Sequence, residues 1–227
     1  MIAAQVLPGL TACTRCERLH DFMAQLKPKK GFSAQDYWNR PVPGFGPVDA
    51  QVWLVGLAPG AHGANRTGRP FTGDGAGDFM YPLLHQAGFC SAVGAEIAAD
   101  DGLELHNLYI SNAVKCLPPG NKPTAAEFAA CRAWMLQEWI ALHEVKVIIA
   151  LGRGAFISLL HFFKTQGLVQ RLADYPFVHG EAYLIGASQW LVPCYHTSRY
   201  NVQTGRMTAR MFLDLTARVH ELLQTEA

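Results

Sequence analysis

Four of the six cysteines in this 227-residue chain have a spacing typical of ligands to one metal centre. Cys13 and Cys16 form a Cys-x-x-Cys turn near the start, and Cys116 and Cys131 follow in the middle of the chain. Such a turn can bind a metal with both thiolates, and a distant pair can complete four sulfur ligands for a zinc ion or an iron–sulfur cluster. We expect this centre to tie residues 1–50 to the rest of the fold.

Disulfide bonds are the alternative for these cysteines, because six is an even number. The N-terminus lacks the charged region and long apolar run of a signal peptide, so we expect a cytoplasmic protein whose thiols stay reduced or bind metal. Cys90 and Cys194 lie among apolar residues and are expected to be small buried hydrophobic side chains. Metal ligation of the other four is the favoured interpretation.

The composition is that of an ordinary globular chain. Half of the residues are hydrophobic, 16% are charged and the net charge is +1. The length suits one domain spanning residues 1–227, and no apolar stretch is long enough for a transmembrane helix. A near-neutral charge neither supports nor excludes nucleic-acid binding, because acids elsewhere can balance a basic groove. Several basic residues do fall in or beside the loops described below: Arg66, Arg69, Lys115, Lys122, Arg199, Arg206 and Arg210.

The hydrophobic pattern predicts strands that alternate with helices. Buried strands are expected at residues 51–57, 106–114, 145–151 and 190–194, with an outlying strand at 181–186. Helices are expected at 75–88, after the capping box 124–127, at 153–163 and at 203–224. Residues 26–50 and 58–74 read as loops. This order predicts a three-layer α/β/α sandwich around a mainly parallel four-stranded sheet, with ligands bound beyond the carboxyl ends of the strands.

Polar and aromatic residues concentrate in the loops that follow these strands. The first loop, from Gly56 to Asp74, is rich in glycine, which allows a ligand to approach the backbone closely. Phe71 in this loop is placed either to stack on a flat ring or to fill the core. Asn112 lies near the carboxyl end of the second strand, and its amide could read the edge of a nucleobase or bond to nearby backbone.

The third loop follows the last strand. His196 stands at the carboxyl end of that strand, where it could donate a hydrogen bond to developing negative charge. Ser198 could bind a phosphate oxygen. Arg199 and Tyr200 form a bulky tip beside it.

These motifs resemble those of the uracil-DNA glycosylases. The matching stretches are Gly56-Leu-Ala-Pro-Gly60, Arg66-Thr-Gly-Arg-Pro-Phe-Thr-Gly-Asp74, Asn112-x-x-x-Cys116 and His196-Thr-Ser-Arg-Tyr-Asn. The cysteine spacing and the Thr-Gly-Asp ending resemble family 5, whereas family 4 carries an acidic residue where Leu57 stands. The resemblance implies a structural [4Fe–4S] cluster on the four cysteines and hydrolytic excision of uracil and other deaminated bases from DNA.

The resemblance also implies roles for individual residues. Phe71 would stack on a base rotated out of DNA, Asn112 would read its Watson–Crick edge, and His196 would stabilise the leaving base anion. Asp74 would orient the attacking water or stabilise the cationic sugar. Further contacts are expected with the base at Gly56, Leu57, Ala58 and Gly60, and with DNA at Arg66, Arg69, Ser198, Arg199, Tyr200 and Arg206.

Two positions depart from the most uracil-specific enzymes. Leu57 cannot position a water molecule, so that task is expected either to move to Asp74 or to become less important. Gly60 stands where those enzymes place a tyrosine that excludes thymine, so a looser pocket is expected.

Two other classes of function remain open on the sequence. One is a non-catalytic iron–sulfur or zinc module that binds DNA, and the other is an electron carrier. A pure binding module has no need of the trio Asn112, His196 and Asp74. No lysine occupies an obvious catalytic position, so we expect a monofunctional enzyme without strand cleavage. We also expect a monomer. Its expected substrate is double-stranded DNA, with single-stranded DNA as a further candidate.

Overall fold

A five-stranded sheet forms the middle layer of the computed structural model, which describes residues 6–91 and 101–225. The strands are β1 (Val52–Gly56), β2 (Leu108–Asn112), β3 (Val147–Leu151), β4 (Tyr183–Ile185) and β5 (Gln189–Cys194), in the order β2-β1-β3-β5-β4. All pairs are parallel except β4 with β5. The expected mainly parallel sandwich is confirmed, but the sheet has five strands rather than four. The outlying segment adds an antiparallel strand to the edge of β5.

The neighbouring central strands β1 and β3 are apolar along their whole length because both faces of the sheet are covered. Every residue of β1, β2 and β3 is buried. Successive side chains alternate between the two faces, so Leu54 and Ile110 belong to one core while Trp53 and Tyr109 belong to the other. This double coverage fixes the register of the strands and therefore the place where each one ends.

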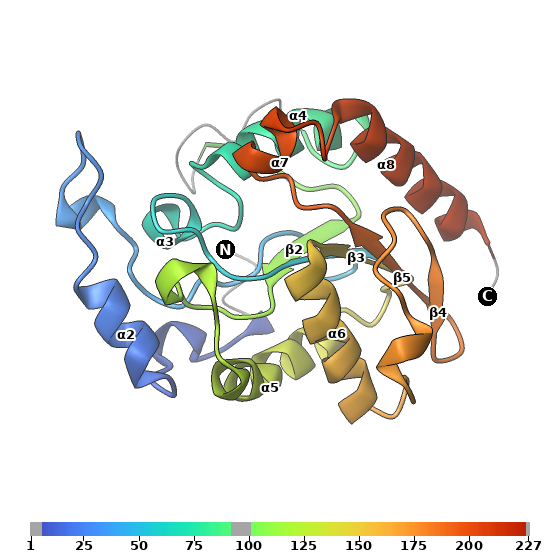
Figure 1. The fold of residues 1–227 in the computed structure, drawn as a ribbon, viewed down its shortest axis with the longest axis horizontal. Coiled ribbons are helices and arrows are strands. Elements are labelled where there is room, and N and C mark those ends of the chain that lie inside the picture. Colours follow the sequence, from blue (N-terminus) through green and yellow to red (C-terminus); the bar gives the residue numbers. More distant parts are fainter. Residues whose placement is uncertain (1–5, 92–100, 226–227) are drawn as a thin grey trace.

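Helices form the two outer layers (Figure 1). On one face lie α4 (Gly75–Gln86), α7 (Arg199–Gln203) and α8 (Ala209–Gln224), and on the other lie α5 (Ala125–Ala141) and α6 (Arg153–Thr165). The helix expected at 203–224 begins later than predicted, at Ala209. α7 ends at Gln203, Gly205 takes a left-handed φ of 71°, and the Thr208 side chain then caps α8 by accepting from the Met211 N–H.

The N-terminal segment packs against α5. It contains a 3₁₀ turn (Leu10–Ala12), the helix α2 (Glu17–Ala24) and a second 3₁₀ turn (Ala34–Asp36), while residues 1–5 lie outside the described part of the chain. Arg18 on α2 donates two hydrogen bonds of 2.7 Å to the Glu127 carboxylate on α5. Leu10, Leu19 and Met23 share a core with Trp134. Packing and an ion pair therefore hold this segment whether or not a metal centre contributes. No described helix is long and apolar enough to cross a membrane.

Candidate functional site

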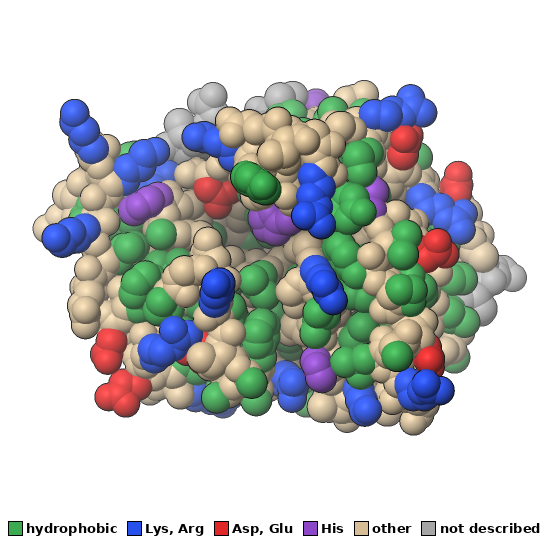
Figure 2. Space-filling model, in the orientation of Figure 1, with side chains coloured by type: hydrophobic (Ala, Val, Ile, Leu, Met, Phe, Trp, Pro, Cys, Tyr) green, Lys and Arg blue, Asp and Glu red, His purple; other side chains and the backbone are tan. Residues whose placement is uncertain are grey.

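A cavity of about 410 Å³ opens beyond the carboxyl ends of the central strands. The three chemistry-bearing loops meet there, and Figure 2 shows the hollow near the centre of that face. Nine of the residues singled out in the sequence line it: Leu57, Ala58, Gly60, Phe71, Asp74, Asn112, His196, Ser198 and Arg199. Gly56 lies behind this wall, where a Cβ would collide with the Asn112 and Phe71 side chains.

Phe71 is held in an unusual backbone conformation at the cavity wall. Its φ of 52° lies in the left-handed region, which costs a bulky residue of order 1–3 kcal/mol and persists only when the surroundings impose it. Gly77 allows this, because a Cβ there would collide with the Phe71 carbonyl. The residue is 7% exposed and belongs to the core as well as to the cavity wall. Phe71 therefore fills the core, as one interpretation expected, and it also borders the cavity, where stacking on a flat ring stays a prediction.

Asn112 brings an unsatisfied polar atom to the cavity. It is the last residue of β2 and is 3% exposed. Among the described residues, its Oδ1 has no hydrogen-bond partner. An unpaired buried acceptor costs about 1–3 kcal/mol, so a ligand that donates an N–H here would recover that energy. The interpretation as a structural asparagine bonded to nearby backbone has no support at Oδ1.

His196 is fixed as one tautomer by its own loop. The Ser198 backbone N–H donates to Nδ1 over 2.9 Å, and because a backbone nitrogen can only donate, Nδ1 is unprotonated and Nε2 carries the hydrogen. The Asn201 side chain holds the loop by donating to the His196 carbonyl over 2.8 Å. Burial lowers the pKa of His196, and the Asp74 carboxylate partly opposes this. The result is a neutral imidazole that can donate a hydrogen bond into the cavity.

We expect nitrogen NMR to show His196 as the neutral Nε2–H tautomer while the pH is lowered through 6.5, where an ordinary histidine takes up a proton. The sign follows from the lowered pKa, since a depressed histidine pKa postpones protonation to more acidic pH. A proton on Nδ1, or titration of His196 at or above pH 6.5, would contradict the assignment.

Asp74 begins α4 and faces the cavity with its second oxygen. Its Oδ1 accepts hydrogen bonds from the Ala76 and Gly77 N–H groups at 3.0 and 3.1 Å, as a helix N-cap does. Its Oδ2 lies against Gly63, where a Cβ would collide with the carboxylate, and 3.2 Å from the position a Cβ would take on Gly60. One oxygen is thus fixed by the helix and the other is left for a ligand or water.

The residues expected to contact DNA separate into a group that faces solvent near the cavity and one residue that is buried. Ser198 caps α7, Arg199 lies over Gly75 at the cavity rim, and Tyr200 is 72% exposed beside them. Arg206 is exposed and stacks on the Tyr195 ring, with its guanidinium carbon 5.4 Å from the ring centre. These positions face solvent near the cavity.

The prediction that Arg69 contacts DNA is wrong. It is 3% exposed, and its guanidinium forms two hydrogen bonds with the Asp101 carboxylate. Lys115 is likewise removed from any basic groove, because it is 1% exposed and lies 2.6 Å from Glu138. Each is a buried cation that needs an anionic partner, and neither partner lies near its cation in the sequence.

Some lining residues were not found from the sequence. Asn121 reaches the cavity from a 3₁₀ turn (Pro119–Asn121) with a left-handed φ of 56°. The only available signal was the Pro-Pro-Gly-Asn stretch after β2, which predicts a turn but not its direction. Ala64 belongs to a short helix, α3 (Ala64–Thr67), inside the first loop, and the other lining residues are Gly75 and Ala76.

The four cysteines predicted as ligands line one small void of about 10 Å³ between α2 and α5. They are not joined by disulfide bonds. Burial raises the pKa of the Cys131 thiol to about 11. The backbone N–H of Lys115 hydrogen-bonds to its sulfur and partly opposes this rise. Within the described ranges, no group of three or more His, Cys, Asp or Glu side chains is arranged to hold a metal ion. The four thiols on one shared void fit a group bound through sulfur, but the arrangement is not a preformed site for a single ion.

Comparison with known proteins identifies the class of the chain. Residues 43–220 match the family model described as the uracil DNA glycosylase superfamily. The chain belongs to this superfamily, and its full-length relatives place it in the type-5 branch.

The relatives agree over most of their length. The chain is 49% identical to a type-5 uracil-DNA glycosylase of Thermus thermophilus over 207 residues, which cover 91% of each protein. It is 41% identical to the type-5 protein of Mycobacterium leprae, covering 91% of this chain and 89% of that one. A type-4 protein of Thermotoga maritima matches over 50% of this chain at 36% identity. The solved structure of Pedobacter heparinus SMUG2 aligns with a TM-score of 0.48 at 15% identity, over 92% of this chain and 98% of that one.

Proposed function

We propose that this protein is a monofunctional DNA glycosylase that hydrolyses the N-glycosidic bond of uracil in DNA and so initiates base excision repair. The observation that carries the proposal is the cavity itself, because one aromatic ring, one unsatisfied amide and one neutral imidazole converge in it. A flipped base needs a stacking surface, an edge reader and a stabiliser of the departing charge. A non-catalytic DNA-binding module would need none of the three together.

The cavity residues assign a role to each step of base capture. Phe71 stacks on the rotated-out ring, which contributes about 1–3 kcal/mol per base. Uracil offers an N3–H donor beside an O4 acceptor, and the Asn112 amide offers the complementary acceptor and donor. Pairing N3–H with the unsatisfied Oδ1 removes the cost of leaving that atom buried and unpaired.

Bond breakage leaves negative charge on the base and positive charge on the sugar. The Nε2–H of His196 donates to the O2 atom of the departing uracil, where that negative charge gathers. A neutral donor suffices, so the lowered pKa of His196 is compatible with this role. The free Oδ2 of Asp74 orients a water molecule for attack on the sugar, or stabilises the cationic sugar by its charge. Leu57 supplies no polar group for either task.

The DNA is double-stranded in this proposal, and the protein acts as a monomer in the cytoplasm. Arg199 or the exposed Tyr200 enters the gap that the flipped nucleotide leaves, as intercalating side chains do. Ser198 and Arg206 contact the backbone beside it. Arg66 also belongs to this surface, and its position is taken up below.

Gly60 gives the pocket room for bases other than uracil. It lines the cavity and carries no side chain that could exclude a methyl or a second ring. We therefore include other deaminated bases, such as hypoxanthine, among the substrates. In Gly60→Tyr the new side chain would start 3.2 Å from Asp74 Oδ2 and narrow the pocket, so activity on hypoxanthine should fall more than activity on uracil. Equal losses on both substrates would contradict the open-pocket interpretation.

The four-cysteine void is proposed to hold a [4Fe–4S] cluster. Cys13, Cys16, Cys116 and Cys131 would be the ligands, and the cluster would supply a structural link between the N-terminal segment and α5 rather than a reaction step. The Lys115 N–H bond to the Cys131 sulfur supports this, because such bonds accompany thiolate ligation.

We expect the protein purified without oxygen to be brown, with about four irons per chain and broad visible absorbance. Replacing Cys116 with alanine should remove most of the colour and iron, whereas Cys194→Ala, which alters a buried cysteine away from the void, should retain both. A colourless wild-type protein that contains one zinc ion would refute the cluster and favour a zinc centre.

The proposed activity is tested by incubating the protein with a labelled duplex that contains one uracil, followed by alkali treatment. We expect strand cleavage only after alkali, because a monofunctional enzyme leaves an intact strand with an abasic site. The same duplex with thymine in place of uracil serves as the control. Absence of alkali-labile sites on uracil and hypoxanthine duplexes alike would refute the function.

A further inference from the structure

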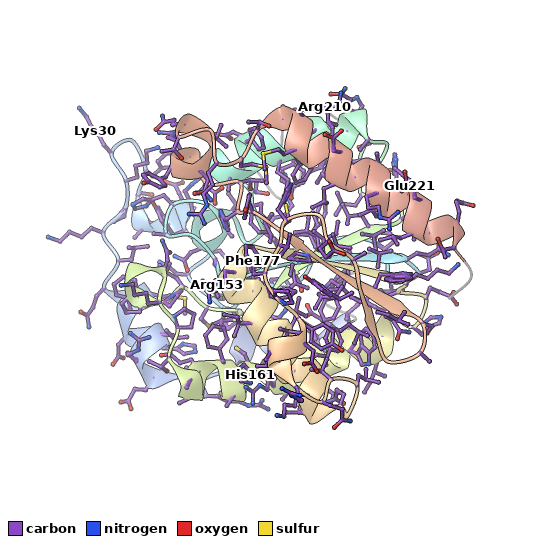
Figure 3. The ribbon with its side chains drawn as sticks, turned by 45° about the vertical axis from the view of Figure 1, so that its right-hand side comes forward. Lys30, Arg153, His161, Phe177, Arg210 and Glu221 are labelled. Atoms are coloured by element: carbon purple, nitrogen blue, oxygen red, sulfur yellow. The ribbon has the colours of Figure 1, made fainter. Side chains whose placement is uncertain are left out.

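The segment between α2 and β1 forms a basic lobe at one end of the molecule. We define the basic lobe as residues 27–40, and it protrudes beside α3 in Figure 1, with Lys30 at its tip in Figure 3. Its four cations, Lys27, Lys29, Lys30 and Arg40, are exposed, and none has an ion-pair partner among the described residues. Its one acid, Asp36, accepts hydrogen bonds from the Ser33 N–H and hydroxyl. Nothing in the catalytic proposal uses this lobe.

The basic lobe is fixed to the loop that forms the cavity. Two backbone hydrogen bonds join it to α3, from the Trp38 N–H to the Arg66 carbonyl at 2.8 Å and from the Asn39 N–H to the Asn65 carbonyl at 3.0 Å. The Tyr37 hydroxyl lies 2.7 Å from the His62 ring. A surface held in this way presents its charges without a large ordering cost on binding.

Arg66 links the lobe to the cavity wall. Its guanidinium carbon lies 4.5 Å from the centre of the Phe32 ring, and Phe32 is 40% exposed on the lobe. On its other side, Arg66 packs against Gly73, where a Cβ would collide with its Nη2. Gly73 immediately precedes Asp74 of the cavity. A continuous surface therefore runs from the lobe through Arg66 to the cavity, and Figure 2 shows basic side chains along this end of the face.

We propose that the basic lobe binds the phosphate backbone of the DNA arm on one side of the flipped nucleotide. Duplex DNA carries one negative charge per about 1.7 Å of its axis, and the exposed lysines of the lobe, which have no ion-pair partner among the described residues, are complementary to it. Because the lobe lies at one end of the face, it reaches one arm of the duplex and not the other. This proposal rests on the proposed function, since it takes the lesion-bearing DNA to lie across the cavity.

The test compares the triple variant Lys27→Gln, Lys29→Gln, Lys30→Gln with a matched control, Lys146→Gln, Lys164→Gln, Arg171→Gln. The control removes the same charge from exposed residues that do not line the cavity. On an undamaged duplex at about 50 mM salt, we expect the lobe variant to bind at least roughly tenfold more weakly and the salt slope to fall by up to about 2.7, or about 0.9 per lost phosphate contact. The control should stay within about twofold of the wild type.

Two truncated duplexes, each with uracil near one end so that one arm is missing, identify the arm that the lobe contacts. With saturating protein, the single-turnover excision rate of the lobe variant should equal that of the wild type, because no lysine of the lobe touches the reacting atoms. At low protein concentration, the defect should persist on the duplex that keeps the lobe-side arm and disappear on the duplex that lacks it.

Wild-type affinity in the lobe variant, or an equal defect on both truncated duplexes, would overturn the proposal. Wild-type affinity would leave the lobe as a surface for another macromolecule. Binding to undamaged duplex requires no catalysis, so these outcomes are distinct from failure of the glycosylase function.

Discussion

His196→Ala should slow uracil excision by roughly 10²–10³-fold, or about 2.7–4 kcal/mol of transition-state stabilisation. The variant loses the Nε2–H donor that the Ser198 N–H fixes in place, while the stacking surface of Phe71 and the amide of Asn112 remain. The measurement is a single-turnover rate with saturating protein. Binding of a uracil duplex should change far less than the rate, because the donor acts mainly on charge that develops as the bond breaks.

Two companion variants separate this role from a structural one. His196→Asn keeps a side-chain donor and should recover part of the rate. His161→Ala removes an exposed histidine from α6 and should leave the rate unchanged. Full activity in His196→Ala would remove the residue from the mechanism. Equal rates for the alanine and asparagine variants would mean that a side-chain donor at this position does not contribute to the rate.

Lys115→Met should destabilise the fold by about 3–5 kcal/mol, because it leaves the Glu138 carboxylate buried without its cation. The two side chains are 1% and 0% exposed, and Nζ lies 2.6 Å from Oε2. Ser111 donates to the same carboxylate over 3.1 Å, and burial already raises the pKa of Glu138. For a chain of this length, the loss corresponds to a fall in Tm of roughly 6–20 °C by thermal scanning.

The double variant Lys115→Met, Glu138→Leu is the control for this effect. It removes both charges, so it should restore most of the lost stability. Iron content must be measured beside Tm, since Lys115 adjoins Cys116 and its N–H bonds to the Cys131 sulfur. A single variant as stable as the wild type, or a double variant less stable than the single one, would contradict a buried ion pair.

The parts of the fold that sequence predicts well are those with a local signal. The strand β3 shows an unbroken apolar run because both its faces are covered, and Thr124 with Glu127 forms the capping box expected at the start of α5. The start of α8 was missed because the apolar stripe continues through Val202 and Met207, although Gly205 and Thr208 are the ordinary signals of a helix end and a new start.

The errors in the site concern partners that are distant in the sequence. Arg69 stands in a polar Gly-rich loop, and its neighbours give no sign that Asp101 will bury it. Lys115 likewise follows a strand, as a loop residue would. Its partner is Glu138, which lies on α5 seven residues after Cys131. The cavity residues were found because parallel strands end at one edge, so topology alone brings their loops together. No local signal marks either ion pair.

A crystal structure of the protein with uracil tests the central claim most directly, since that claim places the base among three loops in one cavity. We expect the ring to lie against Phe71, with N3–H bonded to Asn112 and O2 at about 2.7–3.1 Å from Nε2 of His196. Uracil bound at another site, or bound in the cavity with its O2 atom facing away from His196, would contradict the account.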